Sequence, residues 1–198
     1  MVTDAVAAID FLECRSQIGR YNLSKCGDGE NHVPPYSFHL NEIPVVDSTN
    51  IYIAGYSLGG NVALHTAAIE QKRIAGVASF AGFTPFKTDF NSKPTYGIKR
   101  LYDFHALVPR LGLFQNDYDN IPYDYEELIG SIAPRNILLY VPMDDRDSTY
   151  SDVNECLNKI KSKWGSGSNF NFTSIENMGT AMGKNESDFL YDWLLHQK

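Results

Sequence analysis

The chain has 198 residues, of which 43% are hydrophobic, and this suits one globular domain over 1–198 with a sizeable core. Its formal net charge of −7 and isoelectric point near 5.1 argue against nucleic acid or an anionic membrane surface as a partner. No apolar run approaches the roughly 20 residues of a membrane span, and the first residues predict an acidic amphipathic helix instead of a signal peptide. We expect a soluble, cytoplasmic protein, while three glycosylation sequons, at Asn22, Asn171 and Asn185, keep secretion open.

The three cysteines, Cys14, Cys26 and Cys156, lack the spacing of metal ligands. They are either three buried thiols or one Cys14–Cys26 bridge with a spare thiol. None lies beside a histidine or at a strand end, so none is a candidate nucleophile. We expect no metal site and no cofactor.

Two irregular stretches interrupt the chain. An amphipathic helix is predicted over Val2–Cys14, and the polar stretch Arg15–Val46 that follows shows no period, which predicts a long loop that is an insertion or a lid. The stretch 84–127 is also irregular and is rich in aromatic residues. It is predicted to be a cap-like insertion with a small core of its own, the alternative being a platform for a sugar or aryl group.

Strand and helix patterns alternate through the rest of the chain. The predicted elements, in order, are a strand and helix over 51–70, a strand over 74–83, a strand over 136–141, a helix over 151–164, a strand over 170–175 and a helix over 186–196. The run over 136–141 is continuously apolar, which is typical of a parallel strand covered on both faces. This order predicts an α/β fold, a three-layer parallel sheet with helices on both faces. In such sheets the reactive groups gather beyond the carboxyl ends of the strands.

One motif stands at such a strand end. The hexapeptide that begins at Gly55 reads GYSLGG, between an apolar β-rich run and an alanine-rich helical stretch. A G-x-S-x-G pentapeptide in this setting predicts a nucleophile elbow, which places Ser57 on a sharp strand-to-helix turn. We expect a Cβ on Gly55 or Gly59 to collide with the neighbouring strand or helix. The helix start offers its positive end and free N–H groups to an oxyanion, with the Leu58 N–H as the first donor. The alternative is a glycine-rich turn without a chemical role.

Two further segments follow predicted strands. After the strand over 136–141 the chain reads PMDDRD, which places three carboxylates within four residues. An orienting acid belongs at this place, and we assign it to Asp145 ahead of Asp147, the alternative being an ordinary acidic turn. The second segment is the turn at 177–183, after the last strand.

These pieces together resemble a known family. The elbow, the strand over 74–83, the SIAPR approach at 131–135 and the Asp-rich turn are similar to the carboxyl-terminal part of an α/β-hydrolase, nearest to the dienelactone-hydrolase and acetyl-xylan-esterase-like branch. The resemblance covers the chain in order, with insertions at 15–46 and 84–127. It implies a serine hydrolase acting on a small carboxylic ester, in which Ser57 attacks the carbonyl, Asp145 orients a histidine and that histidine shuttles the proton.

The chain departs from the family pattern in two places. The family base lies in the turn after the last strand, but 177–183 contains no histidine, and Asn177 and Thr180 do not accept a proton near neutral pH. Family members also place several strands before the elbow, and a loop there supplies the second oxyanion donor. Only about 50 residues precede Ile51, mostly predicted helix and loop, so the amino-terminal strands are expected to be missing, either because the chain is truncated or because it has lost that half.

Other histidines are therefore candidates for the base. His105 lies in the aromatic stretch and is the first candidate, and His39 in the early loop is the second. The alternative for His105 is a cap histidine that packs or binds substrate. His65, about two turns into the helix after Ser57, is expected to be structural, and His196 to be solvated.

Two functions remain open. The first is a serine esterase whose proton carrier is His105 or lies outside this chain, and the second is a catalytically silent relative that binds a ligand or a partner beneath the aromatic cap. A fragment with no independent role is a third possibility. With a base and an oxyanion donor both missing, hydrolysis of simple esters is predicted to be weak or absent. The strand at 51–54 would have one edge without its usual neighbour, which invites self-association or pairing with 43–46.

Overall fold

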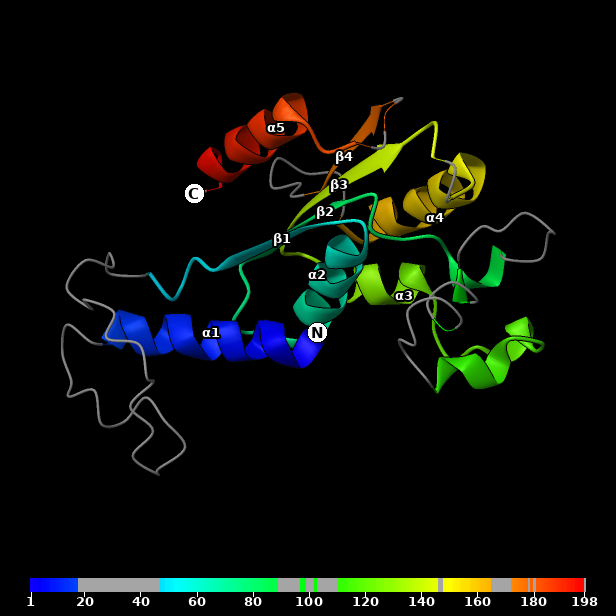
Figure 1. The fold of residues 1–198 in the computed structure, drawn as a ribbon, viewed down its shortest axis with the longest axis horizontal. Coiled ribbons are helices and arrows are strands. Elements are labelled where there is room, and N and C mark those ends of the chain that lie inside the picture. Colours follow the sequence, from blue (N-terminus) through cyan, green and yellow to red (C-terminus); the bar gives the residue numbers. More distant parts are fainter. Residues whose placement is uncertain are drawn as a thin grey trace.

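Four strands form one parallel sheet in the order β1-β2-β3-β4 (Figure 1). The computed structural model describes residues 1–17, 47–88, 97–98, 102, 110–145, 148–164, 172–177, 179 and 181–197. The strands are β1 (Tyr52–Tyr56), β2 (Gly76–Phe80), β3 (Asn136–Pro142) and β4 (Phe172–Asn177). Because all four are parallel, their carboxyl ends lie at one edge of the sheet, and the register pairs Tyr56 with Phe80 and Phe80 with Tyr140.

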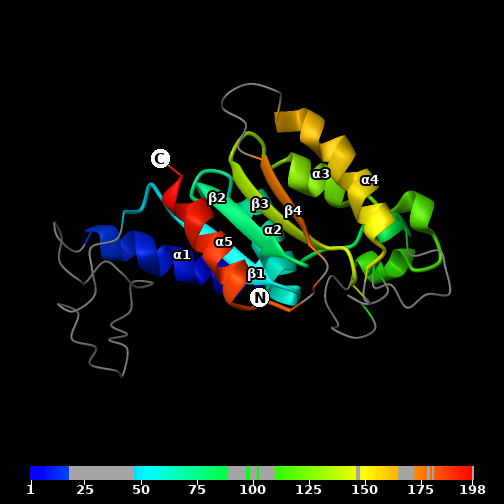
Figure 2. The same ribbon diagram turned by 90° about the horizontal axis from the view of Figure 1, so that it is seen from above.

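Helices cover both faces of this sheet, so the predicted three-layer α/β architecture is confirmed (Figures 1 and 2). The helices are α1 (Val2–Gln17), α2 (Leu58–Ile69), α3 (Tyr125–Gly130), α4 (Tyr150–Lys161) and α5 (Lys184–Leu195). Short 3-10 turns add η3 (Phe86–Thr88), η5 (Leu111–Phe114), η6 (Tyr118–Asn120) and η7 (Ser162–Trp164). Within the described ranges, no helix combines the length and the apolar character needed to cross a membrane.

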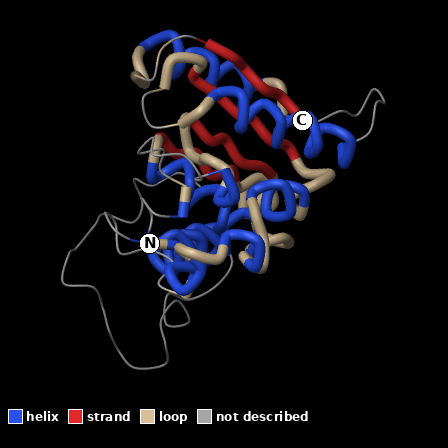
Figure 3. Tube along the Cα trace, turned by 90° about the vertical axis from the view of Figure 1, so that its right-hand side faces the viewer, coloured by secondary structure: helices blue, strands red, loops and turns tan. Residues whose placement is uncertain are grey.

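The sheet separates two groups of buried side chains. Figure 3 shows the strands lying between layers of helices. Successive residues of a strand point to opposite faces, so Ile137 and Leu139 of β3 enter the larger core under α2 and α4. Leu138 and Tyr140 enter the smaller core, which Leu190 and Trp193 of α5 cover. The apolar run of β3 is therefore covered on both faces, as its composition predicts.

Element boundaries differ from the expectations by a few residues. Helix α1 continues to Gln17, three residues beyond its predicted end, and β2 occupies only the middle of the predicted strand. Strand β4 begins two residues late and α5 two residues early. The predicted loop at 15–46 lies outside the described residues from position 18 on, so the expected lack of strands there stays a prediction.

The aromatic stretch at 84–127 does not have a separate core in its described part, and that expectation is wrong. Its buried side chains, Phe86, Ile98, Leu111, Ile121 and Tyr125, belong to the larger core beneath the sheet. The reason is that the ring of Tyr125 contacts both Phe86 and Phe83, and Phe83 lies three residues after the end of β2. That the stretch is a cap-like insertion remains a prediction.

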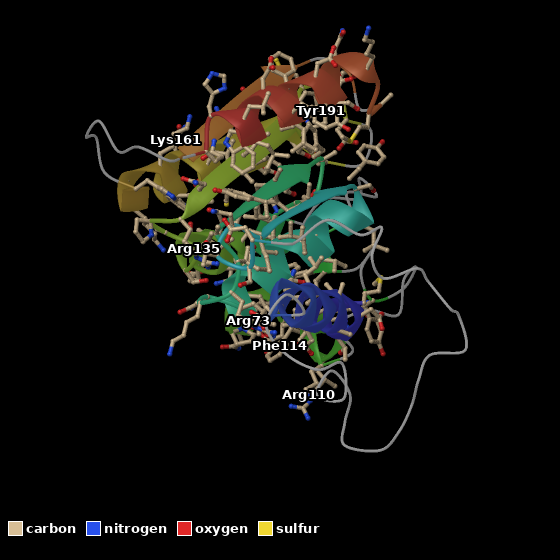
Figure 4. All side chains as sticks on the ribbon, turned by 90° about the vertical axis from the view of Figure 1, so that its left-hand side faces the viewer. Arg73, Arg110, Phe114, Arg135, Lys161 and Tyr191 are labelled. Atoms are coloured by element: carbon tan, nitrogen blue, oxygen red, sulfur yellow. The ribbon has the colours of Figure 1, made fainter. Side chains whose placement is uncertain are left out.

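Two arginines, Arg73 and Arg135, hold the carboxyl-terminal end of α2 in place (Figure 4). Arg135 donates to the carbonyl oxygens of Ala67 at 2.6 Å and Ile74 at 3.1 Å, which joins the last turn of α2 to the approach to β3. Arg73 lies beside α1 in Figure 4 and pairs with Glu70 at 2.8 Å and with Asp10 of α1. Both contacts fix the direction of α2, and therefore the position of its first turn.

Strand β1 lies at one side of the described sheet. Among the described residues it pairs only with β2, so its second edge has no described partner. The segment 43–46, a candidate neighbour, lies outside the described residues. Self-association through this edge stays a prediction.

Candidate active site

Ser57 occupies the turn between β1 and α2. Strand β1 ends at Tyr56, α2 begins at Leu58, and Ser57 has φ 50° and ψ −119°. A positive φ is uncommon for a residue with a side chain and marks local strain of the kind found at functional sites. The Ser57 N–H donates to the Phe80 carbonyl oxygen at 2.8 Å, and its carbonyl accepts from the Asn61 N–H at 3.0 Å. The predicted strand-turn-helix placement of Ser57 is confirmed.

The Ser57 hydroxyl is not used to cap the helix. A serine before the first helical residue usually accepts a hydrogen bond from the first turn, but Ser57 makes no such bond. The first N–H groups of a helix, among them that of Leu58, have no acceptor within the helix. Ser57 is thus the residue before the positive end of α2, and its hydroxyl is not used to cap that end. The oxyanion role of Leu58 stays a prediction.

Of the two glycines that flank Ser57 in the motif, only one is required for steric reasons. A Cβ on Gly55 would overlap the carbonyl carbon and oxygen of Gly59, so the requirement for glycine at position 55 is confirmed. A Cβ on Gly59 would meet no atom within 4 Å, so the expected collision there is wrong. The tight position is Gly60, where a Cβ would lie 2.8 Å from Ser79 Oγ and 3.0 Å from the Gly82 Cα. The first turn of α2 thus presses its Gly60 side, not its Gly59 side, against the sheet.

The end of β2 forms a second strained turn beside the elbow. Ala81 has φ 48°, and its N–H donates to the Tyr140 carbonyl oxygen at 3.0 Å. Gly82 follows, and a Cβ there would lie 2.7 Å from the Gly60 carbonyl carbon. Below the two glycines, the Ser79 hydroxyl is buried and has no hydrogen-bond partner in the described part of the chain. Sequence reasoning missed this turn, for which the Ala-Gly pair at the end of an apolar run was the available signal.

Asp145 lies at the same edge of the sheet as Ser57. Strand β3 ends at Pro142, three residues before Asp145, and parallel pairing through β2 aligns the carboxyl ends of β1 and β3. The expected edge for Asp145 is therefore confirmed. Its carboxylate is partly buried and accepts from the Ser148 hydroxyl at 3.2 Å. Asp147 lies outside the described residues, and an orientation of Asp145 toward 177–183 stays a prediction.

The turn after β4 is held by a carboxylate from the first turn of α5, that of Glu186. The hydroxyl of Tyr140 lies 3.1 Å from Glu186 Oε1 and 3.4 Å from the Gly179 carbonyl oxygen, and its single proton is donated to one of them at a time. Glu186 Oε2 accepts from the Gly183 N–H at 2.8 Å. Main-chain N–H groups of Glu186 and Gly183 lower the pKa of the Glu186 carboxyl. The carboxylate of Glu186 is thus engaged in closing the turn onto α5 and β3.

The structure describes two of the five histidines, His65 and His196. The imidazole of His65 lies in contact with the ring of Tyr123, on the side of the sheet that α2 covers, and His196 is exposed at the end of α5. Their described hydrogen bonds go to main-chain carbonyls of their own helices, so neither bonds to Ser57. The candidate bases His105 and His39 lie outside the described residues.

Comparison with protein families finds one match, which includes the elbow. Residues 36–105 match the model of the Phospholipase/Carboxylesterase family. This stretch takes in β1, Ser57, α2 and β2. None of the curated proteins matches the chain.

Solved structures resemble the chain over most of its length. A promiscuous carbohydrate esterase of family 15 from a marine bacterial metagenome is 17% identical over 77% of this chain and 43% of its own, with a TM-score of 0.63. A glucuronoyl esterase from Solibacter usitatus is 14% identical over 98% of this chain and 47% of its own, with a TM-score of 0.62. The catalytic domain of the glucuronoyl esterase from Hypocrea jecorina is 19% identical over 78% and 47%, with a TM-score of 0.55.

These comparisons establish the fold. The chain has an α/β-hydrolase fold of the kind that esterases use, and the family resemblance inferred from the motifs is confirmed at this level. The chain spans less than half the length of each of these three structures. Fold alone does not fix an activity, because unrelated functions use the same fold.

Proposed function

We propose that this chain carries the nucleophile of a serine-type carboxylic ester hydrolase. The observation that carries the proposal is Ser57, with a positive φ between a parallel strand and a helix N-terminus and with no capping bond to its hydroxyl. A strained serine at this place is the geometry that α/β-hydrolases use to expose a nucleophile. The match of the elbow region to a family of phospholipases and carboxylesterases supports the same reaction class.

Each group has a role in an acyl transfer from a small ester. Ser57 Oγ attacks the ester carbonyl carbon, a base takes the hydroxyl proton, and the carbonyl oxygen becomes an oxyanion that the Leu58 N–H stabilises. Collapse of this intermediate breaks the bond to the alcohol, which leaves with the proton, and water then releases the acid from Ser57. Asp145 orients the base, and His105 is the candidate for that base.

A silent ligand-binding relative is the second candidate, and one observation favours it. The turn at 177–183, where the resemblance places the base, has no histidine, and its described contacts are main-chain ones: the Gly179 carbonyl oxygen with the Tyr140 hydroxyl, and the Gly183 N–H with the Glu186 carboxylate. Without an imidazole hydrogen-bonded to its hydroxyl, Ser57 would stay a poor nucleophile. The two candidates therefore differ in whether Ser57 is activated.

Hydrolysis of p-nitrophenyl acetate at pH 7.5 separates them. We expect slow turnover by the full chain that Ser57→Ala reduces to the rate in buffer, because the nucleophile is lost while the fold is kept. Asp145→Asn and His105→Gln should each lower the rate at least about tenfold if they act as proposed. Ser131→Ala, an exposed serine outside the site, is the control and should retain the full rate. Equal rates for Ser57→Ala and the unaltered chain would exclude Ser57 as the nucleophile.

A further inference from the structure

His65 joins α2 to the stretch that precedes α3. Its imidazole contacts the rings of Tyr123 and Tyr125 edge-to-face, with centroid separations of 6.4 Å and 6.0 Å. Tyr125 is almost fully buried, and its ring also contacts the ring of Phe86, with a centroid separation of 4.8 Å. The imidazole is therefore part of the packing that holds the stretch 121–125 against α2.

The hydrogen bonds of His65 fit a neutral ring. Nδ1 lies 3.0 Å from the Asn61 carbonyl oxygen, and because a carbonyl only accepts, Nδ1 carries the proton. Nε2 then has a lone pair, is buried, and has no partner among the described residues. The side-chain amide of Asn61 donates to the Tyr125 hydroxyl, which completes a polar link from α2 to the same stretch.

The charged groups near this link already have partners. Asp124, next to both tyrosines, accepts from three main-chain N–H groups. The other described carboxylates of the helices packed against α2 also have partners. On α1, Asp4 pairs with the amino terminus, and Asp10 and Glu13 pair with the Arg73 guanidinium. On α3, Glu126 pairs with the Lys159 ammonium, and Glu127 accepts from the Asp124 N–H. The tyrosines of β1, Tyr52 and Tyr56, lie on the α5 face, and β2 has no titratable residue. A positive imidazole would therefore be buried between Tyr123 and Tyr125 without a described counter-ion.

Burial lowers the pKa of His65, and the bond to Asn61 offsets only part of that effect. Protonation would place a charged N–H at Nε2, in apolar surroundings and without an acceptor, which is a costly arrangement. Separation of 121–125 from α2 would let water reach Nε2. The charged ring therefore favours the separated state.

We propose that His65 is an acid-sensitive latch, which holds residues 121–125 against α2 while it is neutral and releases them when it is protonated. The release would extend to η3, because Asp124 in this stretch also holds the N–H groups of Phe86 and Lys87. The direction with pH follows from the lowered pKa. The folded state binds the proton less well than the unfolded state, so stability is full above pH ~6.5 and is lost as the pH falls below it. This inference does not depend on Ser57 being a nucleophile.

Urea unfolding at pH 7.5 and pH 5.5 tests the predicted pH dependence of stability. It is measured for three proteins: the unaltered full chain, His65→Phe and His196→Gln. His65→Phe keeps an aromatic ring but cannot titrate, and His196→Gln removes an exposed histidine as the control. Between the two pH values, the folding equilibrium constant of the unaltered chain should fall about threefold to tenfold more than that of His65→Phe. His196→Gln should behave like the unaltered chain. Equal falls in all three would overturn the proposal, and His65→Gln replaces the Phe variant if that variant does not fold.

Cys156 on α4 reports the local release. It is a free, buried thiol in the same core as Tyr125, and burial raises its pKa to about 12. Cys14 and Cys26 are first replaced by serine, so that Cys156 is the only thiol. The rate at which Cys156 reacts with 4,4′-dithiodipyridine is then measured at each pH in two chains, one with His65 and one with His65→Phe. The ratio of the two rates should rise several-fold from pH 7.5 to pH 5.5. A constant ratio would contradict a latch, whatever the change in global stability.

Discussion

Gly55→Ala should destabilise the protein by about 3 kcal/mol or more, whereas Gly59→Ala should leave its stability unchanged or slightly raised. The two glycines flank Ser57 in the motif, yet only Gly55 is enclosed. A Cβ on Gly55 overlaps the Gly59 carbonyl, which is main chain and cannot rotate away. A Cβ on Gly59 meets open space in the first turn of α2, where alanine has a better helix propensity than glycine.

Urea unfolding followed by circular dichroism compares the two variants at pH 7.5. For a chain of this size, a loss of 3 kcal/mol lowers Tm by roughly 6–12 °C, so thermal melting provides a second measurement. Gly55→Ala should also lose any activity that depends on Ser57, because α2 has to move away from β1. Equal stability of the two variants would show that the elbow is not packed as described.

Asp124→Ala should destabilise the fold by about 3–5 kcal/mol. The carboxylate of Asp124 is 6% exposed and accepts from the N–H groups of Phe86 at 2.8 Å, Lys87 at 3.0 Å and Tyr125 at 2.7 Å. Alanine would leave these donors without their acceptor, and removal of the partner of a buried donor costs its full desolvation. The variant also loses the cap of α3, since Asp124 is the residue before its first turn.

The control for Asp124 is Asp119→Ala, which removes an exposed carboxylate from η6 in the same part of the chain. This change should alter the free energy of unfolding by less than about 0.5 kcal/mol. Asp124→Asn keeps one acceptor oxygen and should fall between the two. If Asp124→Ala unfolds at the same urea concentration as Asp119→Ala, the carboxylate does not hold η3 to α3.

Local patterns were sufficient to predict the elbow. The apolar run before Gly55, the motif itself and the helical stretch after it fix β1, the Ser57 turn and α2, all of which are contiguous in sequence. The edge position of Asp145 also followed, because an apolar run ending just before it indicated a parallel strand. Both predictions depend on short-range periodicity, which a sequence shows directly.

Contacts between distant segments were not predictable in this way. Asp124 holds Phe86 across 38 residues, and His65 meets Tyr123 only after the stretch 84–127 has folded back onto α2. The same contacts explain why the aromatic residues of that stretch enter the main core. The glycine error has a similar origin, because the choice between Gly59 and Gly60 depends on how far α2 is rotated against the sheet.

The central claim is that Ser57 is an activated nucleophile, and a fluorophosphonate probe tests it most directly. The probe forms a covalent bond to a serine hydroxyl that is activated by its surroundings, and peptide mapping by mass spectrometry locates the adduct. The full folded chain should gain one adduct, on Ser57. Ser57→Ala and the urea-unfolded chain should gain none, because the serine needs the helix N-terminus and a base in place. A folded chain without an adduct on Ser57, or one labelled no faster than the unfolded chain, would contradict the claim.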